Sequence, residues 1–338
     1  MPHTLVTGAN GFVAAHIIDQ LVALGHSITG SVRSTSKGQQ ILDKHPEYKS
    51  KVKFVVVSDF TKPGTWDSAF QEADIDYVIH TAAPLLDDPT NTDFDKDFLK
   101  PSVHGMTELL QSASKFGKNV KCVVVTGSIN AVTTGQDIET RKFNSSEWLP
   151  VSIEDARQAQ NPYISYCVAK AEAEKALWSY VTTNKPTYSV VVLLPALIFG
   201  PPIQPFSSLK KINFSTDQLY SLFNGTYQVL PPTAFPSYID VRDLATAHIS
   251  SLTTPAVANK RFLIGGLPFS NKMVIDVLSE MKEFQGKLPE DSGEKVGKVN
   301  FTDVAEWNEA LGLNLRTPYQ TFGETALFLQ NLETEMEH

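Results

Sequence analysis

Cysteine is scarce in this chain of 338 residues: it has only Cys122 and Cys167, and their spacing is not that of a metal site. Cys122 stands in an apolar stretch, and we expect it to be a small core residue. No apolar run reaches the roughly 18 residues of a membrane-spanning helix. The first strand-like stretch begins at residue 3 or 4, which leaves no room for a signal peptide. We therefore expect a cytoplasmic protein with no metal site and no membrane span.

Clustered positive charge is also missing. The formal net charge is −8, and the densest basic pair is Lys210-Lys211, which we interpret as a solvated surface. Nucleic-acid and anionic-membrane binders usually carry a basic patch. We therefore expect neither partner, and a small molecule as the ligand.

What the sequence does contain is a regular alternation of short apolar strands and amphipathic helices over its first two hundred residues. Helices between consecutive apolar strands indicate an α/β fold with a parallel sheet covered on both faces. The expected strands are 4–7, 26–32, 52–57, 75–80, 120–126, 188–194 and 261–264. The expected helices are 11–24, 36–45, 64–72, 93–116, 162–183, one from 240–243 to 252, 270–284, and two more near the end of the chain after a strand-like piece at 296–301.

The alternation stops after Pro195, where the stretch 196–237 is rich in proline, phenylalanine and glycine. We expect one domain from residues 1–195 plus about 238–265, and a smaller lobe from 196–237 and 266–338. Ligands of open α/β sheets bind at the carboxyl edge of the strands. The smaller lobe is therefore expected to cover that edge and to contact the substrate.

A glycine-rich turn follows the first strand and reads Thr7-Gly8-Ala9-Asn10-Gly11-Phe12-Val13-Ala14. Gly8 permits a sharp turn, Gly11 permits close approach of a pyrophosphate, and Ala14 lets the next helix pack on the sheet. Free N–H groups at the start of that helix would face the phosphates. The spacing G-x-x-G-x-x-A departs from G-x-G-x-x-G, so an ordinary strand-to-helix turn is the alternative.

One Tyr-x-x-x-Lys pair occurs in the chain, Tyr166 and Lys170, and the two share a face of the expected helix 162–183. Ser128 ends the strand before it, at the same edge of the sheet. An ammonium group favours ionisation of a nearby tyrosine, which makes it a better acid–base group. Together they predict carbonyl reduction, with Ser128 holding the oxygen, Tyr166 giving the proton and Lys170 tuning Tyr166. A serine turn beside a surface helix pair is the alternative.

These motifs together resemble those of the extended short-chain dehydrogenase/reductase family. The stretches His80-Thr-Ala-Ala-Pro84, Leu194-Pro-Ala-Leu-Ile-Phe-Gly-Pro201 and Tyr238-Ile-Asp-Val-Arg-Asp-Leu-Ala245 narrow the resemblance. The chain is most similar to fungal NADPH-dependent carbonyl reductases of the methylglyoxal/isovaleraldehyde type, which are related to dihydroflavonol reductases. The resemblance implies a Rossmann-type doubly wound sheet, NADPH as cofactor, and Ser128, Tyr166 and Lys170 as the catalytic residues.

The choice of cofactor follows from the end of the second strand. An NAD enzyme usually has an acidic residue there for the ribose hydroxyl, but this chain has Arg33, followed by Lys37. The Arg33 guanidinium suits a 2′-phosphate, so we expect NADPH; a basic residue flanking a helix is the alternative. With the resemblance, the expected cofactor-binding residues are Thr7, Gly8, Asn10, Gly11, Phe12, Val13, Arg33, Lys37, Asp59, Phe60, Ala82, Ala83, Thr126, Tyr166, Lys170, Pro195, Leu197 and Ile198.

One position departs from the family pattern. The family often has an asparagine in the fourth helix that supports a water relay to the lysine, and His104 stands in the matching stretch. His104 either replaces that asparagine or is a packed histidine.

The substrate pocket is expected to be mostly apolar, with no arginine to bind a carboxylate or phosphate. This predicts uncharged aldehydes and ketones. Its expected lining residues are Leu85, Asn130, Val132, Tyr163, Phe199 and Phe206. No strong apolar helix pair demands a dimer, so we expect a monomer or a weak homodimer.

Two other functions share the fold. Sugar-nucleotide dehydratases of the family have an Asp-Glu pair after the serine or threonine, whereas this chain has Ile129-Asn130. Epimerases usually carry the acidic residue that Arg33 replaces here. A non-catalytic sensor of the nicotinamide redox state is the third interpretation, but such sensors tend to lose the Tyr/Lys pair.

Overall fold

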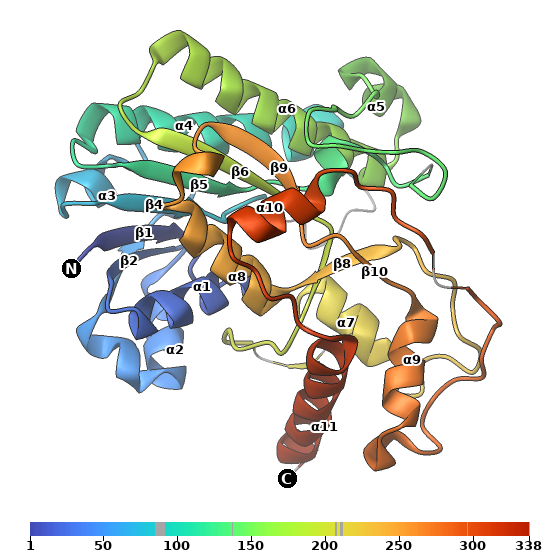
Figure 1. The fold of residues 1–338 in the computed structure, drawn as a ribbon. Coiled ribbons are helices and arrows are strands. Elements are labelled where there is room, and N and C mark those ends of the chain that lie inside the picture. Colours follow the sequence, from blue (N-terminus) through green and yellow to red (C-terminus); the bar gives the residue numbers. More distant parts are fainter. Residues whose placement is uncertain (85–91, 137, 207, 210–211, 296, 338) are drawn as a thin grey trace.

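The computed structural model describes residues 1–84, 92–136, 138–206, 208–209, 212–295 and 297–337. Seven parallel strands form the main sheet in the order β3-β2-β1-β4-β5-β6-β9 (Figure 1). The α/β fold class expected from the sequence is confirmed. The strands are β1 (His3–Thr7), β2 (Ser27–Val32), β3 (Val52–Val56), β4 (Tyr77–His80), β5 (Cys122–Thr126), β6 (Ser189–Pro195) and β9 (Lys260–Ile264).

Helices cover both faces of this sheet. On one face lie α3 (Asp67–Gln71), α4 (Lys100–Phe116), α5 (Ile153–Ala159) and α6 (Pro162–Asn184). On the other lie α1 (Phe12–Ala23), α2 (Thr35–Lys44) and α8 (Val241–Ser251), as Figure 1 shows. A π-helical segment, Phe94–Leu99, precedes α4 and takes up the first part of the helix expected from residue 93.

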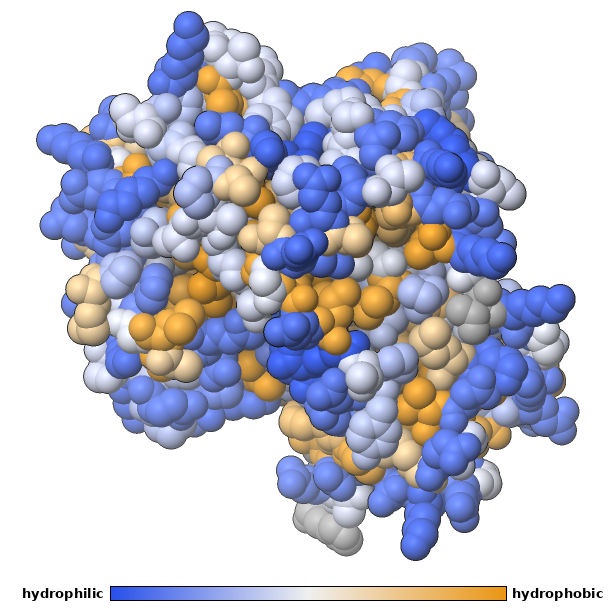
Figure 2. All heavy atoms as spheres, viewed as in Figure 1, coloured by the Kyte–Doolittle hydropathy of each residue, from blue (hydrophilic) through white to orange (hydrophobic). Residues whose placement is uncertain are grey.

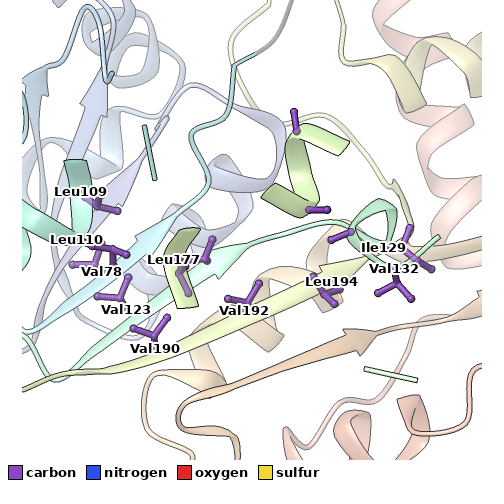
Figure 3. Close-up of a cluster of buried hydrophobic side chains, with 14 of the residues drawn as sticks. Val78, Leu109, Leu110, Val123, Ile129, Val132, Leu177, Val190, Val192 and Leu194 are labelled. Atoms are coloured by element: carbon purple, nitrogen blue, oxygen red, sulfur yellow. The ribbon is translucent and has the colours of Figure 1, made fainter. Parts of the chain in front are cut away.

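Alternating side chains of the central strands build the two cores. In β5, Val123 and Val125 face the α4–α6 side, whereas Cys122 and Val124 face the α1–α8 side. The same alternation holds in β6, because successive strand residues point to opposite faces. Figure 3 shows Val123, Val190 and Val192 of the strands packed with Leu109, Leu110 and Leu177 of the helices.

A three-stranded sheet, β10-β8-β7, lies beyond the carboxyl edge of β6. It packs with α7 (Phe214–Ser221), α9 (Asn271–Ser279) and α11 (Glu324–Glu337) around an aromatic cluster of Phe199, Tyr238, Phe269 and Phe322, in which the Phe199 and Phe269 rings lie 4.8 Å apart. Its strands are β7 (Leu197–Phe199), β8 (Ser237–Asp240) and β10 (Leu267–Pro268).

Two segments pack differently from the boundaries expected from the sequence. Strand β8 belongs to the small sheet, although residues 238–265 were expected with the large domain. Helix α10 (Val304–Ala310) packs on β9 of the main sheet, where Trp307 stacks on Phe262 at 5.0 Å. Residues 297–301 form only an isolated bridge, Phe143 to Phe301, instead of a strand.

A buried ion-pair cluster joins the small lobe to the large one. Asp240 is fully buried at the start of α8 and accepts hydrogen bonds from Arg242 and from the hydroxyl of Thr321. Arg242 also pairs with Glu324 at the start of α11, at 2.5 Å.

The face in Figure 2 is mostly hydrophilic, with hydrophobic residues gathered in separate patches.

Candidate active site

From β1 the chain continues to β2 and β3 on one side of the sheet, and from β4 it continues to β5 and β6 on the other side. A groove begins at this switch point between β1 and β4. Gly8 follows β1 with φ +67°, and a Cβ atom on it would lie 3.2 Å from the Cα atom of Ala82 after β4. Gly11 begins α1 without any side-chain cap, so backbone N–H groups of the first turn are available to a phosphate. Glycine is therefore required at position 8 both for its backbone angle and for this close approach.

Thr7 fixes the two strand ends relative to one another. Its Oγ1 accepts the N–H groups of Thr81 and Ala82, both at 3.1 Å. Because both acceptor positions are then used, the hydroxyl donates to Nδ1 of His80 at 2.9 Å. His80 is buried, and burial, assisted by the charge of Lys170, lowers its pKa to about 3. The imidazole is therefore neutral and keeps the hydrogen bond from Thr7.

A groove of about 430 Å³ runs from this turn to the end of β2. Arg33 and Lys37 are exposed along it, and neither has an ion-pair partner among the residues that the structure describes. Of the residues expected to bind the cofactor, the groove brings together Gly8, Asn10, Gly11, Phe12, Val13, Arg33, Lys37, Phe60, Ala82, Ala83 and Thr126.

Seven of the expected cofactor residues do not line the groove: Tyr166, Lys170, Leu197 and Ile198 line a second cavity, and Thr7, Asp59 and Pro195 line neither. Thr7 lies beneath it, as described above. Asp59 accepts hydrogen bonds from the N–H and the hydroxyl of Thr61, at 3.0 and 2.6 Å, and so shapes the turn that carries Phe60. Pro195 is the buried last residue of β6, and the residues after it, Leu197 and Ile198, line the second cavity.

Six groove residues are not among the expected cofactor residues: Ala14, Ser31, Val32, Val57, Trp66 and Thr81. Ser31 and Thr81 stand at or just after strand ends, a signal that could have found them. Trp66 is fully buried, and its indole N–H has no acceptor within the described part of the chain. A nicotinamide dinucleotide therefore fits this groove, which supplies a glycine turn, two exposed cations and an indole N–H donor that no described residue uses.

Ser128, Tyr166 and Lys170 meet in the second cavity, which has a volume of about 950 Å³. Ser128 follows β5 and caps the short helix η3 (Ile129–Ala131). Tyr166 and Lys170 lie on successive turns of α6, where Nζ of Lys170 is 5.8 Å from the centre of the Tyr166 ring. Helix α6 begins at Pro162, a residue that suits the first helical position. The side chain of Asn161 caps this end by accepting the N–H groups of Tyr163 and Ile164.

The two cavities meet beside Phe12, which lines both. Apart from Lys170, no charged side chain among the described residues lines the second cavity. Its apolar wall comes from both lobes, and it also includes polar residues that the sequence did not predict. The unexpected lining residues include Phe98, Ser102, Phe214, Gln218 and Phe235.

Of the six expected substrate-pocket residues, Asn130 and Tyr163 line the cavity. Val132 does not: it is 1% exposed and lies in the core beside Ile129 (Figure 3). Phe199 is also 1% exposed, because it packs in the aromatic cluster. Phe206 instead packs under Lys44 of α2, whose Nζ is 4.7 Å from the ring centre. Leu85 lies outside the described residues.

His104 is exposed on α4 and lines neither cavity. Ser102, two residues earlier, lines the second cavity together with Lys170. Two residues are about 200° apart around a helix, so Ser102 and His104 face opposite ways. His104 therefore does not take the place of the family asparagine.

Among the residues that the structure describes, no cluster of three or more His, Cys, Asp or Glu side chains could hold a metal ion. No helix in the same part of the chain has the length and apolarity needed to cross a membrane.

Comparison with known proteins finds reductases among the relatives of this chain. An NADPH-dependent methylglyoxal reductase of Saccharomyces cerevisiae is 31% identical over 95% of this chain and 96% of its own. A ketoreductase of Aspergillus niger is 32% identical over 84% of each chain. The solved structure of the yeast methylglyoxal/isovaleraldehyde reductase complexed with NADPH superposes with a TM-score of 0.87, at 28% identity, over 98% of this chain and 99% of that one.

The model of the NAD dependent epimerase/dehydratase family matches residues 4–265. Those residues contain the glycine turn, the groove with Arg33, and the Ser128, Tyr166 and Lys170 set. The chain belongs to this family, the extended short-chain dehydrogenases/reductases.

Proposed function

We propose that this protein is an NADPH-dependent carbonyl reductase that converts uncharged aldehydes or ketones to alcohols. The observation that carries the proposal is the junction of the two cavities: a groove lined by the exposed Arg33 and Lys37 opens onto an apolar cavity that holds Ser128, Tyr166 and Lys170. The relatives named as methylglyoxal reductase and ketoreductase support the same reaction class.

Each residue of the site has a role in this proposal. The glycine turn and the first turn of α1 would hold the pyrophosphate, while Arg33 and Lys37 would bind the 2′-phosphate. When bound, the cofactor supplies the hydride. Ser128 holds the carbonyl oxygen by hydrogen bonding, and Tyr166 donates the proton to that oxygen. The positive charge of Lys170 stabilises the phenolate that Tyr166 leaves behind.

Thr126, which lines the groove, is held in one orientation. Nδ1–H of His248 donates to the carbonyl oxygen of Leu244 at 2.8 Å, because that oxygen can only accept. Nε2 of His248 must then accept the Thr126 hydroxyl proton, at 2.7 Å. The Thr126 oxygen therefore offers only its lone pairs to the groove, as an acceptor.

The lining of the second cavity favours the reductase over the epimerase or dehydratase reaction. A sugar nucleotide carries a diphosphate, and the described cavity wall offers it no arginine. No carboxylate lines the described wall near Ser128 either, where a dehydratase needs one. Large lining residues such as Phe98, Phe214 and Phe235 suit bulky or aryl carbonyl compounds.

Deuterium transfer tests the reaction. The protein is incubated with NADPH deuterated at the transferring position and with an aryl ketone or methylglyoxal, and the product is analysed by mass spectrometry. One deuterium in the alcohol is expected. Tightly retained nicotinamide without net transfer to any carbonyl would instead favour an epimerase.

We also propose that the chain is divided into a cofactor domain and a smaller substrate lobe. We propose a monomer or a weak homodimer as its assembly. A reducing cytoplasmic location agrees with two free, buried cysteines.

A further inference from the structure

We propose that the hydroxyl of Tyr163 is a positioning group: by tying Asn130 and the chain after it to α6, it sets the position of Ser128 relative to Tyr166. This inference rests on the proposed function, since it concerns the geometry of the same site. From the sequence, Tyr163 and Asn130 are expected only as walls of the substrate pocket.

The hydrogen bonds around Asn130 leave one orientation for its amide group. Its Nδ2 donates to the carbonyl oxygen of Thr133 at 3.1 Å and to Oη of Tyr163 at 2.9 Å. A carbonyl oxygen can only accept, so the nitrogen must face Thr133. The amide oxygen, Oδ1, is thereby directed at Ser128.

Ser128 meets Asn130 at two atoms. The backbone N–H of Asn130 donates to Oγ of Ser128 at 3.2 Å, which fixes where that oxygen lies. The Ser128 hydroxyl donates to Oδ1 of Asn130 at 3.3 Å. This second bond is long, so the proton can turn to a substrate carbonyl at small cost while the serine oxygen stays in place.

Tyr163 connects this loop to the helix that carries the proton donor. Its hydroxyl donates to the carbonyl oxygen of Thr134 at 2.8 Å and accepts from Asn130, so it bridges two points of the loop. Tyr163 and Tyr166 are three residues apart on α6 and therefore share a face. The only role assigned to Tyr163 is this bridge; the proton donor is Tyr166.

The test compares Tyr163→Phe with Tyr188→Phe. Tyr188 also donates its hydroxyl to a carbonyl oxygen, that of Leu110 at 3.0 Å, but it lines neither cavity. The variants are assayed for kcat and KM of carbonyl reduction, for NADPH affinity by fluorescence titration, and for Tm. For Tyr163→Phe we expect kcat to fall about tenfold or more, because misplacement of a catalytic group lowers the rate more than it lowers binding. NADPH affinity should stay unchanged, and the Tm change should match that of Tyr188→Phe.

A double-mutant cycle separates positioning of Ser128 from general disturbance. In a Ser128→Ala background, Tyr163→Phe should cost no further activity, and Asn130→Ala should behave in the same way. An equal loss of kcat in both backgrounds would overturn the inference, as would a Tyr163→Phe enzyme as active as Tyr188→Phe. If the wild-type protein reduces no carbonyl at all, the proposed function falls and this inference falls with it.

Discussion

The ammonium nitrogen of Lys170 lies 5.8 Å from the centre of the Tyr166 ring, one turn further along α6. Both side chains line the cavity that Ser128 also reaches from the end of β5. Under the proposed function, a proton donor, the charge that stabilises its conjugate base and a donor for the carbonyl oxygen are thus presented to one substrate.

Replacing Tyr166 by phenylalanine removes the proposed proton donor and little else. We expect kcat to fall by about a hundredfold or more, the usual contribution of a general acid. NADPH affinity, measured by fluorescence titration, should change by less than about threefold, because the ring remains. Retention of more than about a tenth of the activity would show that another group donates the proton.

Arg33→Glu should reverse the cofactor preference. Loss of a charge-assisted contact with the 2′-phosphate, and repulsion by the new carboxylate, should weaken NADPH about a hundredfold. NADH should be affected far less, since it lacks that phosphate. Lys53→Glu changes the charge equally on the exposed side of β3, outside the groove, and should leave both dissociation constants unchanged. An unchanged preference in Arg33→Glu would remove Arg33 from the phosphate site.

Gly105→Ala should displace the ring of Phe60, which lines the groove. A Cβ atom on Gly105 of α4 would lie 2.2 Å from Cε2 of Phe60, and Phe60 lines the groove. Alanine ordinarily stabilises a helix by about 0.5–1 kcal/mol relative to glycine. Here we expect NADPH affinity to fall several-fold as the Phe60 ring is displaced. The neighbouring exposed His104→Ala serves as control; equal affinities in both variants would contradict this packing argument.

Acid should destabilise the protein through three buried histidines. Burial lowers the pKa of His16 to about 4, of His80 to about 3 and of His248 to about 4. Because these folded-state values lie below the unfolded value of 6.5, the unfolded chain binds more protons between pH 6.5 and about 4. The stabilisation is therefore complete above pH 6.5 and is lost as the pH falls below it.

Urea unfolding between about pH 7.5 and 5 measures this loss, expected at roughly 1 kcal/mol per histidine for each pH unit below 6.5. His16 donates from Nε2 to the carbonyl oxygen of Pro201, and glutamine can donate there without titrating. His16→Gln should therefore reduce the pH slope by about one third. A free energy of unfolding that stays flat over this range would contradict the prediction.

Local rules were sufficient to predict that the three proposed catalytic residues lie in one cavity. Tyr166 and Lys170 were predictable because helical spacing alone places them on one face, and Ser128 because it ends a strand at the same edge as the helix start. Arg33 was predictable in the same way, as the residue that follows β2. These positions depend on a few neighbouring residues and on the known edge of a parallel sheet.

The cavity wall could not be predicted in this way, because it depends on how distant segments meet. Phe199 turns into the aromatic cluster, while Phe214, from a helix the sequence did not predict, faces the cavity. Near Ser128, Asn130 faces the cavity and Val132 faces the core, a difference set by the short helix η3. Composition alone does not distinguish such neighbours.

Loss of reduced-nicotinamide absorbance, with NADPH and NADH side by side, tests the central claim most directly. The substrates are methylglyoxal, an aliphatic aldehyde and an aryl ketone, and Tyr166→Phe is the matched control. The account predicts turnover by the wild-type protein with NADPH well above NADH, and turnover at least about a hundredfold lower by Tyr166→Phe. Turnover that prefers NADH, or more than about a tenth of the activity in Tyr166→Phe, would contradict it.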